Sequence, residues 1–448
     1  MDTKLPEVID LFSGCGGLSL GFQSEGFNVT HGIELMTAAT ETVSYNEHWR
    51  FGKESGHICG SITDMSPDIW KDKIGKNGCI VIGGPPCQAY SLAGRAKLAS
   101  LGEKRKNTND ARGYLFEDYL RFVYGLNAKA VVMENVPEST NYGGMNVPQK
   151  VCDSLRRHGY KAKWTILNAA DFGVPQIRER VILIAVKKDL GFDIDLPVPT
   201  HKNPEGKKTQ NQMRFKSFEE NRSFTVPHEP SADAKNWVTV GEALGDLPVL
   251  FKNENQKYIL ERTIAEKDYR TKEQNDYQHV MRNWYGHPEL SVTGNCFRRT
   301  ERDFPIFARM KEGDNYSAAA EIADHLFEEA CEREKIYVKA GEDYEKLKKK
   351  IVPPYARDKF LAKWQKLQSD KPSHTLVAHL SVDTYSHIHP KEPRGISVRE
   401  AARLQSFPDG FLFQCSMGDA FKQIGNAVPP LLSKAVAHQI KTAFQENK

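Results

Sequence analysis

The sequence predicts an α/β fold built around a mainly parallel sheet, and three observations support this prediction. Short apolar runs alternate with amphipathic stretches through the first 190 residues, which is typical of βαβ units. Glycine, proline and acidic residues follow the apolar runs, at the sheet edge where such folds bind ligands. Hydrophobic residues make up 39% of the 448-residue chain, so it can bury a large core and form two or three domains.

The expected elements of the N-terminal region alternate in order along the chain. Strands are expected at residues 8–12, 28–34, 57–62, 79–82, 130–134, 163–167 and 181–186. Helices are expected at residues 18–25, 38–49, 115–126 and 149–157. Each strand runs into a turn or a polar segment, so the strands can align in one sheet.

The pattern changes after residue 189. Residues 199–235 are polar and rich in Pro, Asn and Lys, which predicts a loop. Residues 315–350 are densely charged at helical spacing, which predicts a solvated helical face. Helical patterning returns at residues 398–405 and 430–444.

Composition limits the compartment and the class of partner. The eight cysteines are scattered and form no CxxC pair, which argues against a zinc ribbon or a disulfide framework and for a reducing, intracellular setting. We also expect no metal site. No run approaches the roughly 18 apolar residues of a membrane helix, and the N-terminus lacks the apolar core of a signal peptide. The net charge of +4 permits nucleic-acid binding without demonstrating it.

A candidate nucleophile lies after the expected strand at 79–82. Pro85 and Pro86 directly precede Cys87, and two consecutive prolines stiffen a loop so that it can aim one side chain. The thiolate is the strongest common side-chain nucleophile near neutral pH. On these residues alone, a half-buried structural cysteine is equally consistent, since cysteine is often buried.

A glycine loop follows the first expected strand. Gly14, Gly16 and Gly17 allow positive φ and close approach of a nucleotide-like ligand, and the next helix offers N–H groups to an anionic end. No third glycine stands at the GxGxxG spacing, which favours a ligand other than a dinucleotide. Glu34 closes the second strand, where an acid can hold ribose hydroxyls. A surface acid is the alternative for Glu34.

Two further polar groups lie at strand ends. Glu134 follows an apolar strand, where partial desolvation raises a carboxyl pKa and lets the group donate a proton. Gln176, Arg178 and Arg180 alternate in extended chain and would share one face, so two guanidiniums could hold a phosphate or polarise a carbonyl. A structural acid and a polar strand entry are the respective alternatives.

Taken together, these motifs resemble those of the cytosine-5 DNA methyltransferases of bacteria and phages. The matching segments, in the family's unpermuted order, are residues 10–17, 84–91, 134–136, 176–180, 399–408 and 425–428. The resemblance covers about residues 6–190 and 372–445. It implies a Rossmann-like sheet of the S-adenosylmethionine-dependent methyltransferase type with a separate target-recognition domain.

The resemblance also implies a covalent reaction on a cytosine flipped out of double-stranded DNA. Cys87 would add to C6, and Glu134 would bind or protonate N3 before C5 takes the methyl group. Arg178 would hold the carbonyl oxygen of the base, and Arg180 would support Glu134 or the adjoining phosphate. The other residues assigned to catalysis or DNA contact are Gln88, Ser91, Arg95, Gln176 and Thr375.

The same resemblance assigns the cofactor site. S-adenosylmethionine would be held by Phe12, Ser13, Gly14, Gly16, Gly17, Glu34, Leu35, Ser61, Ile62, Pro86, Leu115 and Asn426. Two positions depart from the family pattern. Ser61 stands where the family usually has Asp, with Asp64 three positions on, and Leu35 stands where many members have Trp. Both departures concern cofactor affinity rather than the reaction.

The implied organisation has a catalytic and cofactor-binding domain at residues 1–190. A target-recognition domain would cover 191–390, and residues 391–448 would return to the catalytic domain. Candidate groove readers are Arg282, Asn283, Arg298, Arg299, Arg302 and His379, with ordinary surface charge as the alternative. The expected setting is the cytoplasm and nucleoid of a prokaryote. We expect a monomer on double-stranded DNA, with a companion restriction endonuclease that it does not contact and no membrane.

Three alternatives stay open on the sequence. The first is the tRNA-directed branch of the same family, whose longer cysteine-phenylalanine signature differs from Cys296-Phe297 here. The second is an inactive nucleic-acid-binding homologue, disfavoured by the intact Cys87 and Glu134. The third is a dinucleotide oxidoreductase, disfavoured by the glycine spacing.

Overall fold

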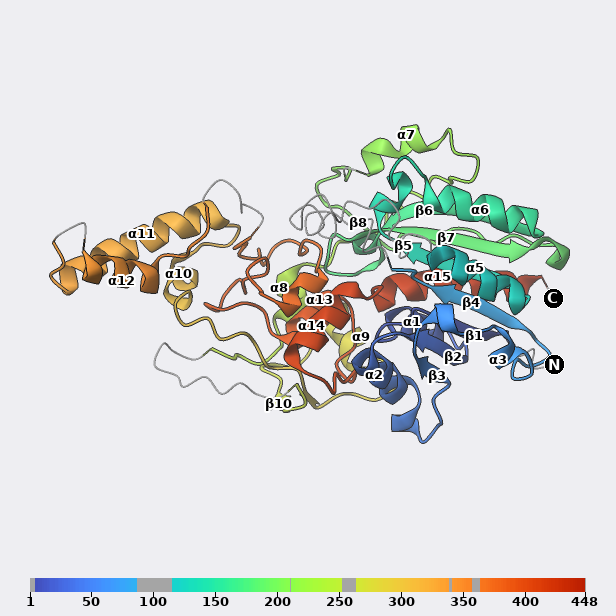
Figure 1. Cartoon of the computed structure of the whole chain (residues 1–448), viewed down its shortest axis with the longest axis horizontal. Coiled ribbons are helices and arrows are strands. Elements are labelled where there is room, and N and C mark those ends of the chain that lie inside the picture. The colour runs from blue at the N-terminus through green and yellow to red at the C-terminus, as the bar shows by residue number, and fades with distance from the viewer. Residues whose placement is uncertain are drawn as a thin grey trace. The chain divides into compact units, whose positions relative to one another are not determined.

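The computed structural model describes residues 5–86, 115–209, 211–251, 263–337, 341–356 and 363–447. The chain forms two compact units (Figure 1). The first contains Met1–Trp237 together with Ala427–Lys448, and the second contains Val238–Asn426. These units are defined by packing. The expected division into a catalytic domain (1–190), a target-recognition domain (191–390) and a returning segment (391–448) concerns function and stays a prediction.

The first unit is built on a seven-stranded sheet in the order β3-β2-β1-β4-β5-β7-β6. Its strands are β1 (Glu7–Leu11), β2 (Val29–Glu34), β3 (His57–Cys59), β4 (Cys79–Gly83), β5 (Ala130–Asn135), β6 (Tyr160–Asn168) and β7 (Glu179–Lys187). Every neighbouring pair from β3 to β5 is parallel, and β7 runs antiparallel to both β5 and β6. The predicted α/β fold with a mainly parallel sheet is confirmed.

Helices cover both faces of this sheet, because the buried strand residues alternate between two apolar clusters. On β4, Val81 packs into the cluster that includes α5 (Leu115–Gly125) and α6 (Val147–Arg157). Ile80 and Ile82 pack into the cluster that includes α1 (Gly17–Ser24) and α15 (Pro430–Glu446). A strand buried on both faces reads as one continuous apolar run, as residues 79–82 do.

The reversal of β7 follows from its short connection to β6. The link holds only the short 3-10 helix η6 (Ala169–Phe172) and no α-helix, so β7 pairs antiparallel with β6, starting with Asn168 opposite Glu179. The Asn168 side chain accepts hydrogen bonds from the backbone N–H of Ala170 (3.3 Å) and of Arg178 (3.1 Å). As a result, β7 begins at the edge where the parallel strands end.

Two local predictions are corrected by the structure. The strand expected over residues 57–62 ends at Cys59, and Ile62 begins the turn η2 (Ile62–Asp64). The loop expected at 199–235 contains the short helix α7 (Phe215–Phe218) and a two-residue strand pair, β8 (His201–Lys202) with β9 (Lys235–Asn236). Aromatic rings at Phe218 and Phe224 pack on the buried Trp164, a long-range contact that local polarity conceals.

The second unit is mainly helical. Its helices are α8 (Val240–Leu244), α9 (Asp276–Arg282), α10 (Phe304–Arg309), α11 (Tyr316–Arg333), α12 (Glu342–Ile351), α13 (Val398–Leu404) and α14 (Met417–Asn426). Its described strands are β10 (Lys267–Asp268) and β11 (Ser291–Val292), which pair antiparallel. The charged region predicted to be helical forms α11 and α12, which lie side by side in Figure 1 and share a small apolar cluster. None of the described helices is long and apolar enough to cross a membrane.

Buried ion pairs hold the helical end of this unit together. Arg403 on α13 binds Asp409 at 2.6 Å and Asp246 at 3.0 Å. Arg399 donates to the backbone carbonyls of Thr293 (2.9 Å) and Phe411 (2.8 Å). These arginines, which belong to the motif at 399–408, therefore stabilise the unit internally.

Candidate active site

The candidate site lies at the carboxyl edge of the parallel strands in the first unit. The loop after β1, Glu34 at the end of β2, Pro85 after β4 and Glu134 in β5 all reach this edge. Because β7 is antiparallel, its first residues reach the same edge. The sheet therefore gathers most of the predicted catalytic and cofactor residues of this unit on one side.

The glycine loop wraps around the Glu34 carboxylate. Gly14 donates its backbone N–H to Glu34 Oε2 at 2.9 Å, and Met36 donates to Glu34 Oε1 at 2.8 Å. Gly14 and Gly16 have φ values of 55° and 91°, and Phe12 has φ of 61°. Positive φ is uncommon for a phenylalanine and marks a strained loop held by its surroundings. Gly17 then begins α1.

Side chains around this loop fit a ligand with polar and apolar parts. The Ser13 hydroxyl is buried and has no hydrogen-bond partner among the residues described. Leu35, next to Glu34, is 70% exposed, so its apolar surface is available to a ligand ring. An orphaned hydroxyl, a fixed carboxylate and an open leucine in one place fit the groups of S-adenosylmethionine.

Ser61 is linked to the nearby acid by a chain of hydroxyls. The Ser61 and Thr63 hydroxyl oxygens lie 2.7 Å apart, and the Thr63 hydroxyl donates to Asp64 Oδ1 at 3.1 Å. Asp64 is exposed and lies three positions after Ser61, which is the position where the family resembled by the sequence usually has an acid. The turn therefore places an acid and a hydroxyl together, although the order of the residues differs.

Helix α5 anchors that turn. Arg121 donates to the backbone carbonyl of Ile62 at 2.7 Å and to that of Met65 at 2.6 Å, and it pairs with Asp118 at 3.0 Å. Leu115, the first residue of α5, packs against the same apolar cluster that contains Ile62. Ile62 and Leu115, both predicted at the cofactor site, thus belong to one packed region.

Glu134 lies between two arginines. Arg180 Nε is 2.8 Å from Glu134 Oε1, and Arg178 also acts on the charge of Glu134. Glu134 is 9% exposed. Burial raises its pKa above the usual carboxyl value, while attraction to Arg180 and Arg178 opposes that rise. The resulting group holds a proton more readily than an exposed glutamate.

The two arginines differ in their supports. Arg178 is buried and donates from Nη2 to the backbone carbonyl of Ala427 at 3.0 Å. Arg180 donates from Nη1 to the carbonyl of Glu179 at 2.7 Å. Gln176 is fully buried just before them. The hydrogen bond from Arg178 to Ala427 joins the residues just before β7 to the segment just before α15. The two residues are 249 positions apart in the sequence.

Glu134 also lies against the strand that leads to Cys87. A Cβ added to Gly84 would be 2.9 Å from Glu134 Oε2, so only glycine leaves room for the carboxylate here. The Asn135 side chain donates to the Pro85 carbonyl at 3.4 Å, and Pro86 is half-buried. Cys87, Gln88, Ser91 and Arg95 lie outside the described residues.

The remaining predicted residues belong to the second unit. Thr375 is half-buried, and Asn426 is exposed at the end of α14. Among the candidate groove readers, Arg282 is buried, pairs with Asp246 at 2.6 Å and stacks over Tyr269. Arg282 is therefore a structural arginine, and its proposed role in base reading is wrong. The residues around Arg282 in the sequence could not show that its partner is Asp246, because Asp246 lies 36 positions earlier in the chain.

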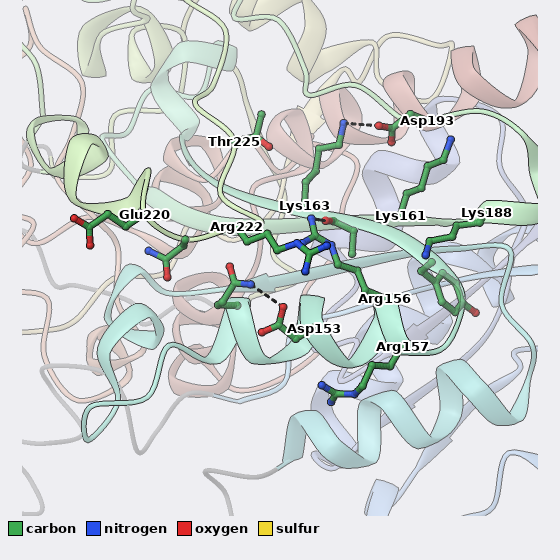
Figure 2. Close-up of a pocket in the computed structure, with 14 residues that line it drawn as sticks. Asp153, Arg156, Arg157, Lys161, Lys163, Lys188, Asp193, Glu220, Arg222 and Thr225 are labelled. Carbon is green, nitrogen blue, oxygen red and sulfur yellow. Dashed lines mark hydrogen bonds and ion pairs between the residues drawn. The ribbon is translucent and has the colours of Figure 1, made fainter.

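A separate basic hollow of about 1010 Å³ lies in the first unit (Figure 2). Its basic side chains are Arg156, Arg157, Lys161, Lys163, Lys188 and Arg222, and its acids are Asp153, Asp193 and Glu220. In Figure 2 Arg156 and Arg222 extend into the hollow, and Lys163 pairs with Asp193 at 3.3 Å. Tyr160 in its wall pairs with Lys187, the last residue of β7. That places the hollow away from the edge that carries Glu134, so it has no part in the candidate active site.

Comparison with known proteins agrees with this geometry. The profile of a family described as C-5 cytosine-specific DNA methylase matches residues 7–442. A protein of Oceanobacillus iheyensis designated type II methyltransferase M.OihORF3336P is 55% identical over 448 residues, covering 99% of this chain and 97% of that protein. Type II methyltransferase M.AgeI of Thalassovita gelatinovora is 30% identical, covering 98% of this chain and 100% of that protein.

A solved structure has the same fold. It is the crystal structure of a prophage-encoded E. coli protein designated a DNA modification methyltransferase, with a TM-score of 0.65 and 23% sequence identity. The match covers 98% of this chain and 99% of that one. The two chains therefore share the same backbone fold.

Proposed function

The chain belongs to the C-5 cytosine-specific DNA methylase family, and from this premise we propose that it modifies cytosine within one short double-stranded DNA sequence through a covalent adduct between Cys87 and C6. The family makes it a DNA (cytosine-5-)-methyltransferase that uses S-adenosylmethionine. The target sequence, the flipped base, the adduct and the residue roles belong to the proposal.

The proposed reaction follows from the chemistry of cytosine. The target base leaves the stack, because C6 is inaccessible inside a duplex. The Cys87 thiolate adds to C6 while Glu134 holds a proton at N3, so the ring accepts the electron pair and C5 becomes nucleophilic. S-adenosylmethionine, when bound, supplies the methyl group that C5 takes. The C5 proton is then lost to solvent water, and the C5–H electron pair re-forms the C5–C6 double bond. The C6–S electron pair returns to the sulfur of Cys87, and the N3 proton returns to Glu134.

The two arginines have different proposed tasks. Arg178 directs its charge at the carbonyl oxygen of the base, where negative charge develops after the thiolate adds. Arg180 positions Glu134 through the 2.8 Å contact. The observation that carries the proposal is the placement of Glu134, buried beside Arg180 and against Gly84 three positions before Cys87.

The cofactor residues have roles consistent with their positions. Glu34, fixed by the N–H groups of Gly14 and Met36, would hold the ribose hydroxyls. Phe12 and Leu35 offer apolar contact to the adenine ring, and Ser61 with Asp64 offers polar partners to its amino group.

The cellular setting completes the proposal. Relatives designated type II methyltransferases support a role in restriction–modification, with a companion endonuclease that need not contact this chain. The proposed form on DNA is a monomer, and the proposed location is the cytoplasm beside the nucleoid. Residues 191–390 are the proposed target-recognition domain.

A trapping experiment tests the covalent step. A duplex that carries 5-fluorocytosine at the target cannot lose a proton from C5, so the adduct should accumulate when the methyl donor is present. We expect a DNA–protein complex that survives denaturation with the wild type and not with Cys87→Ala. Labelled methyl transfer to unmodified duplex without any trapped complex contradicts the covalent mechanism, and transfer to tRNA alone contradicts the DNA substrate.

A further inference from the structure

Three buried side chains near the glycine loop form a cluster that the proposed reaction does not use. We call Glu47, His48 and His57 the Glu–His cluster. Glu47 Oε2 lies 4.0 Å from His48 Nε2 and 3.9 Å from His57 Nε2, and one ligand atom from each residue lies within 4.8 Å of the others. The side chains of Glu47 and His57 are 0% exposed, and that of His48 is 7% exposed.

Five polar atoms of this cluster make no hydrogen bond of ordinary geometry to the residues described. These are both carboxylate oxygens of Glu47, Nε2 of His48 and both ring nitrogens of His57. The nearby Ser19 hydroxyl, which also acts on Glu47, donates its hydrogen to Asp10 Oδ2 at 2.6 Å. The separations of 3.9 and 4.0 Å are too long for hydrogen bonds within the cluster. Since buried polar groups are nearly always satisfied in folded proteins, so many orphaned atoms in one place indicate a missing partner.

Two glycines leave space for these polar atoms. A Cβ at Gly16 would lie 2.5 Å from Glu47 Oε1, and a Cβ at Gly32 would lie 2.6 Å from His57 Nε2. The neighbouring Asp10 is also buried, with Oδ1 unpartnered and Oδ2 bonded to the Ser19 hydroxyl at 2.6 Å. The Glu–His cluster thus lies beside a second buried carboxyl group that has one oxygen unsatisfied among the described residues.

We propose that the Glu–His cluster binds one divalent first-row transition-metal ion, with zinc as the physiological ion. Two imidazole nitrogens and one carboxylate oxygen are ligands that zinc prefers. Bonds of about 2.0–2.1 Å in a tetrahedral site place two ligand atoms roughly 3.4 Å apart. Closing the two Glu47–His separations by about half an ångström, and the His48–His57 separation from its value within 4.8 Å, would complete three of the four ligand positions.

The second His–carboxylate group of the chain shows why this cluster is distinct. His389, Glu392 and Glu400 also gather ligand atoms within 4.8 Å. There, however, Arg394 donates to Glu400 at 2.7 Å and to Glu392 at 2.9 Å. An arginine already supplies the positive charge and the hydrogen bonds in that group, whereas no described arginine or lysine donates a hydrogen bond to the orphaned atoms of the Glu–His cluster.

The proposed ion has a structural role. Glu47 ends α2 (Thr37–Glu47), His48 follows that helix, and His57 begins β3. Gly16 of the cofactor loop lies against Glu47. One ion would therefore join the end of α2 to the sheet beside the loop predicted to bind the methyl donor. This role requires no methyl transfer, so it can hold or fail independently of the proposed function. It also differs from the expectation that the chain has no metal site.

Metal analysis of the full-length chain tests the proposal. After purification without an affinity tag and dialysis against metal-free buffer, we expect close to one zinc per chain. Glu47→Gln and His57→Gln should lower the zinc content at least about tenfold, and His438→Gln, an exposed histidine paired with Glu25, should leave it unchanged. Zinc at the wild-type level in both cluster variants overturns the assignment of the site.

A second measurement keeps the test valid if those variants fail to fold. Wild-type protein stripped with a chelator should take up Co²⁺ with the intense visible absorption of a tetrahedral site, and Zn²⁺ should displace it. The unfolding temperature should fall on stripping and recover with Zn²⁺ but not with Mg²⁺, which prefers oxygen ligands. A stripped protein with an unchanged unfolding temperature and no cobalt spectrum overturns the proposal.

Discussion

At the scale of single residues, burial and charge act on Glu134 in opposite directions. Burial raises the pKa of Glu134, and Arg180 and Arg178 oppose that rise. The net rise favours a carboxyl group that holds a proton more readily than an exposed glutamate, which suits a residue proposed to act at N3 of the base. The arginines then position the group and limit how far its pKa rises.

Replacing Glu134 should therefore remove proton transfer and leave the methyl donor bound. We expect Glu134→Gln to lower kcat by about 10²–10⁴-fold and to change the Kd for S-adenosylmethionine by less than about twofold. Arg157→Gln, in the separate basic hollow, is the matched control for loss of a polar side chain. Single-turnover methylation and calorimetry measure the two quantities, and a kcat close to that of the wild type contradicts the role of Glu134.

Arg180 should control the pH range of activity. Its charge lowers the pKa of Glu134, so Arg180→Gln removes that effect and the folded pKa of Glu134 rises further. Activity that needs protonated Glu134 is present below this pKa and lost as pH rises through it. The alkaline limb of the kcat profile should consequently move to higher pH in Arg180→Gln, at a reduced maximum. An alkaline limb that stays in place or moves to lower pH contradicts this role.

At the scale of elements, sequence patterns located the strands well because both faces of the sheet are buried. Runs such as residues 79–82 and 130–134 are apolar throughout, and each forms a strand. The reversal of β7 and the helix α7 were not predictable in the same way. The first depends on a connection too short for a crossover helix, and the second on aromatic contacts with Trp164.

Most of the candidate site was predictable because its motifs follow strands. Glu34, Glu134 and Arg180 lie where a parallel sheet collects ligands. The Glu–His cluster was not predictable, because His57 lies ten positions from Glu47 and only the pairing of β2 with β3 places it beside α2. Arg282 is the opposite case, because the sequence suggested a DNA contact that the structure does not support. Its side chain is buried and paired with Asp246.

The glycine loop gives a prediction at this scale. Gly14 and Gly16 both have positive φ, but a Cβ at Gly14 meets nothing within 4 Å, whereas one at Gly16 lies 2.5 Å from Glu47 Oε1 and 2.7 Å from Val43 Cγ2. Gly14→Ala should cost about 1–2 kcal/mol of unfolding free energy from backbone strain. Gly16→Ala should cost about 1–3 kcal/mol more from overpacking.

Denaturant unfolding of the two variants provides the comparison. Equal losses of stability in Gly14→Ala and Gly16→Ala would show that the contact with α2 has no energetic role. A smaller loss in Gly16→Ala than in Gly14→Ala contradicts the packing described for the loop.

At the scale of the whole molecule, the chain leaves its first unit and returns to it. Residues 427–448 pack with residues 1–237, and α15 covers α1 and the sheet. Gly21 allows close contact, since a Cβ there would lie 2.4 Å from Ser433 Cβ. Periodicity predicted the helix, but its packing against an element more than 400 positions away depends on tertiary structure.

Removal of this segment should unfold the first unit. The side chains of Leu432, Val436, Ile440 and Phe444 are buried on α15, and each contributes about 1.5–3 kcal/mol when buried. Their sum is comparable with the roughly 5–15 kcal/mol that stabilises a domain. We expect truncation after Asn426 to abolish cooperative unfolding measured by circular dichroism. Truncation after Gln445, which removes only the last three residues, is the control and should keep it.

The central claim is that this chain methylates C5 of cytosine in one short DNA sequence through Cys87. Bisulfite sequencing of plasmid DNA from cells expressing the chain measures this most directly, with Cys87→Ser expressed at the same level as the control. We predict methylation confined to a single short sequence with the wild type, and none with Cys87→Ser. Methylation by the Cys87→Ser variant at a level near that of the wild type would contradict the proposed mechanism, and methylation scattered without a common sequence would contradict the proposed specificity.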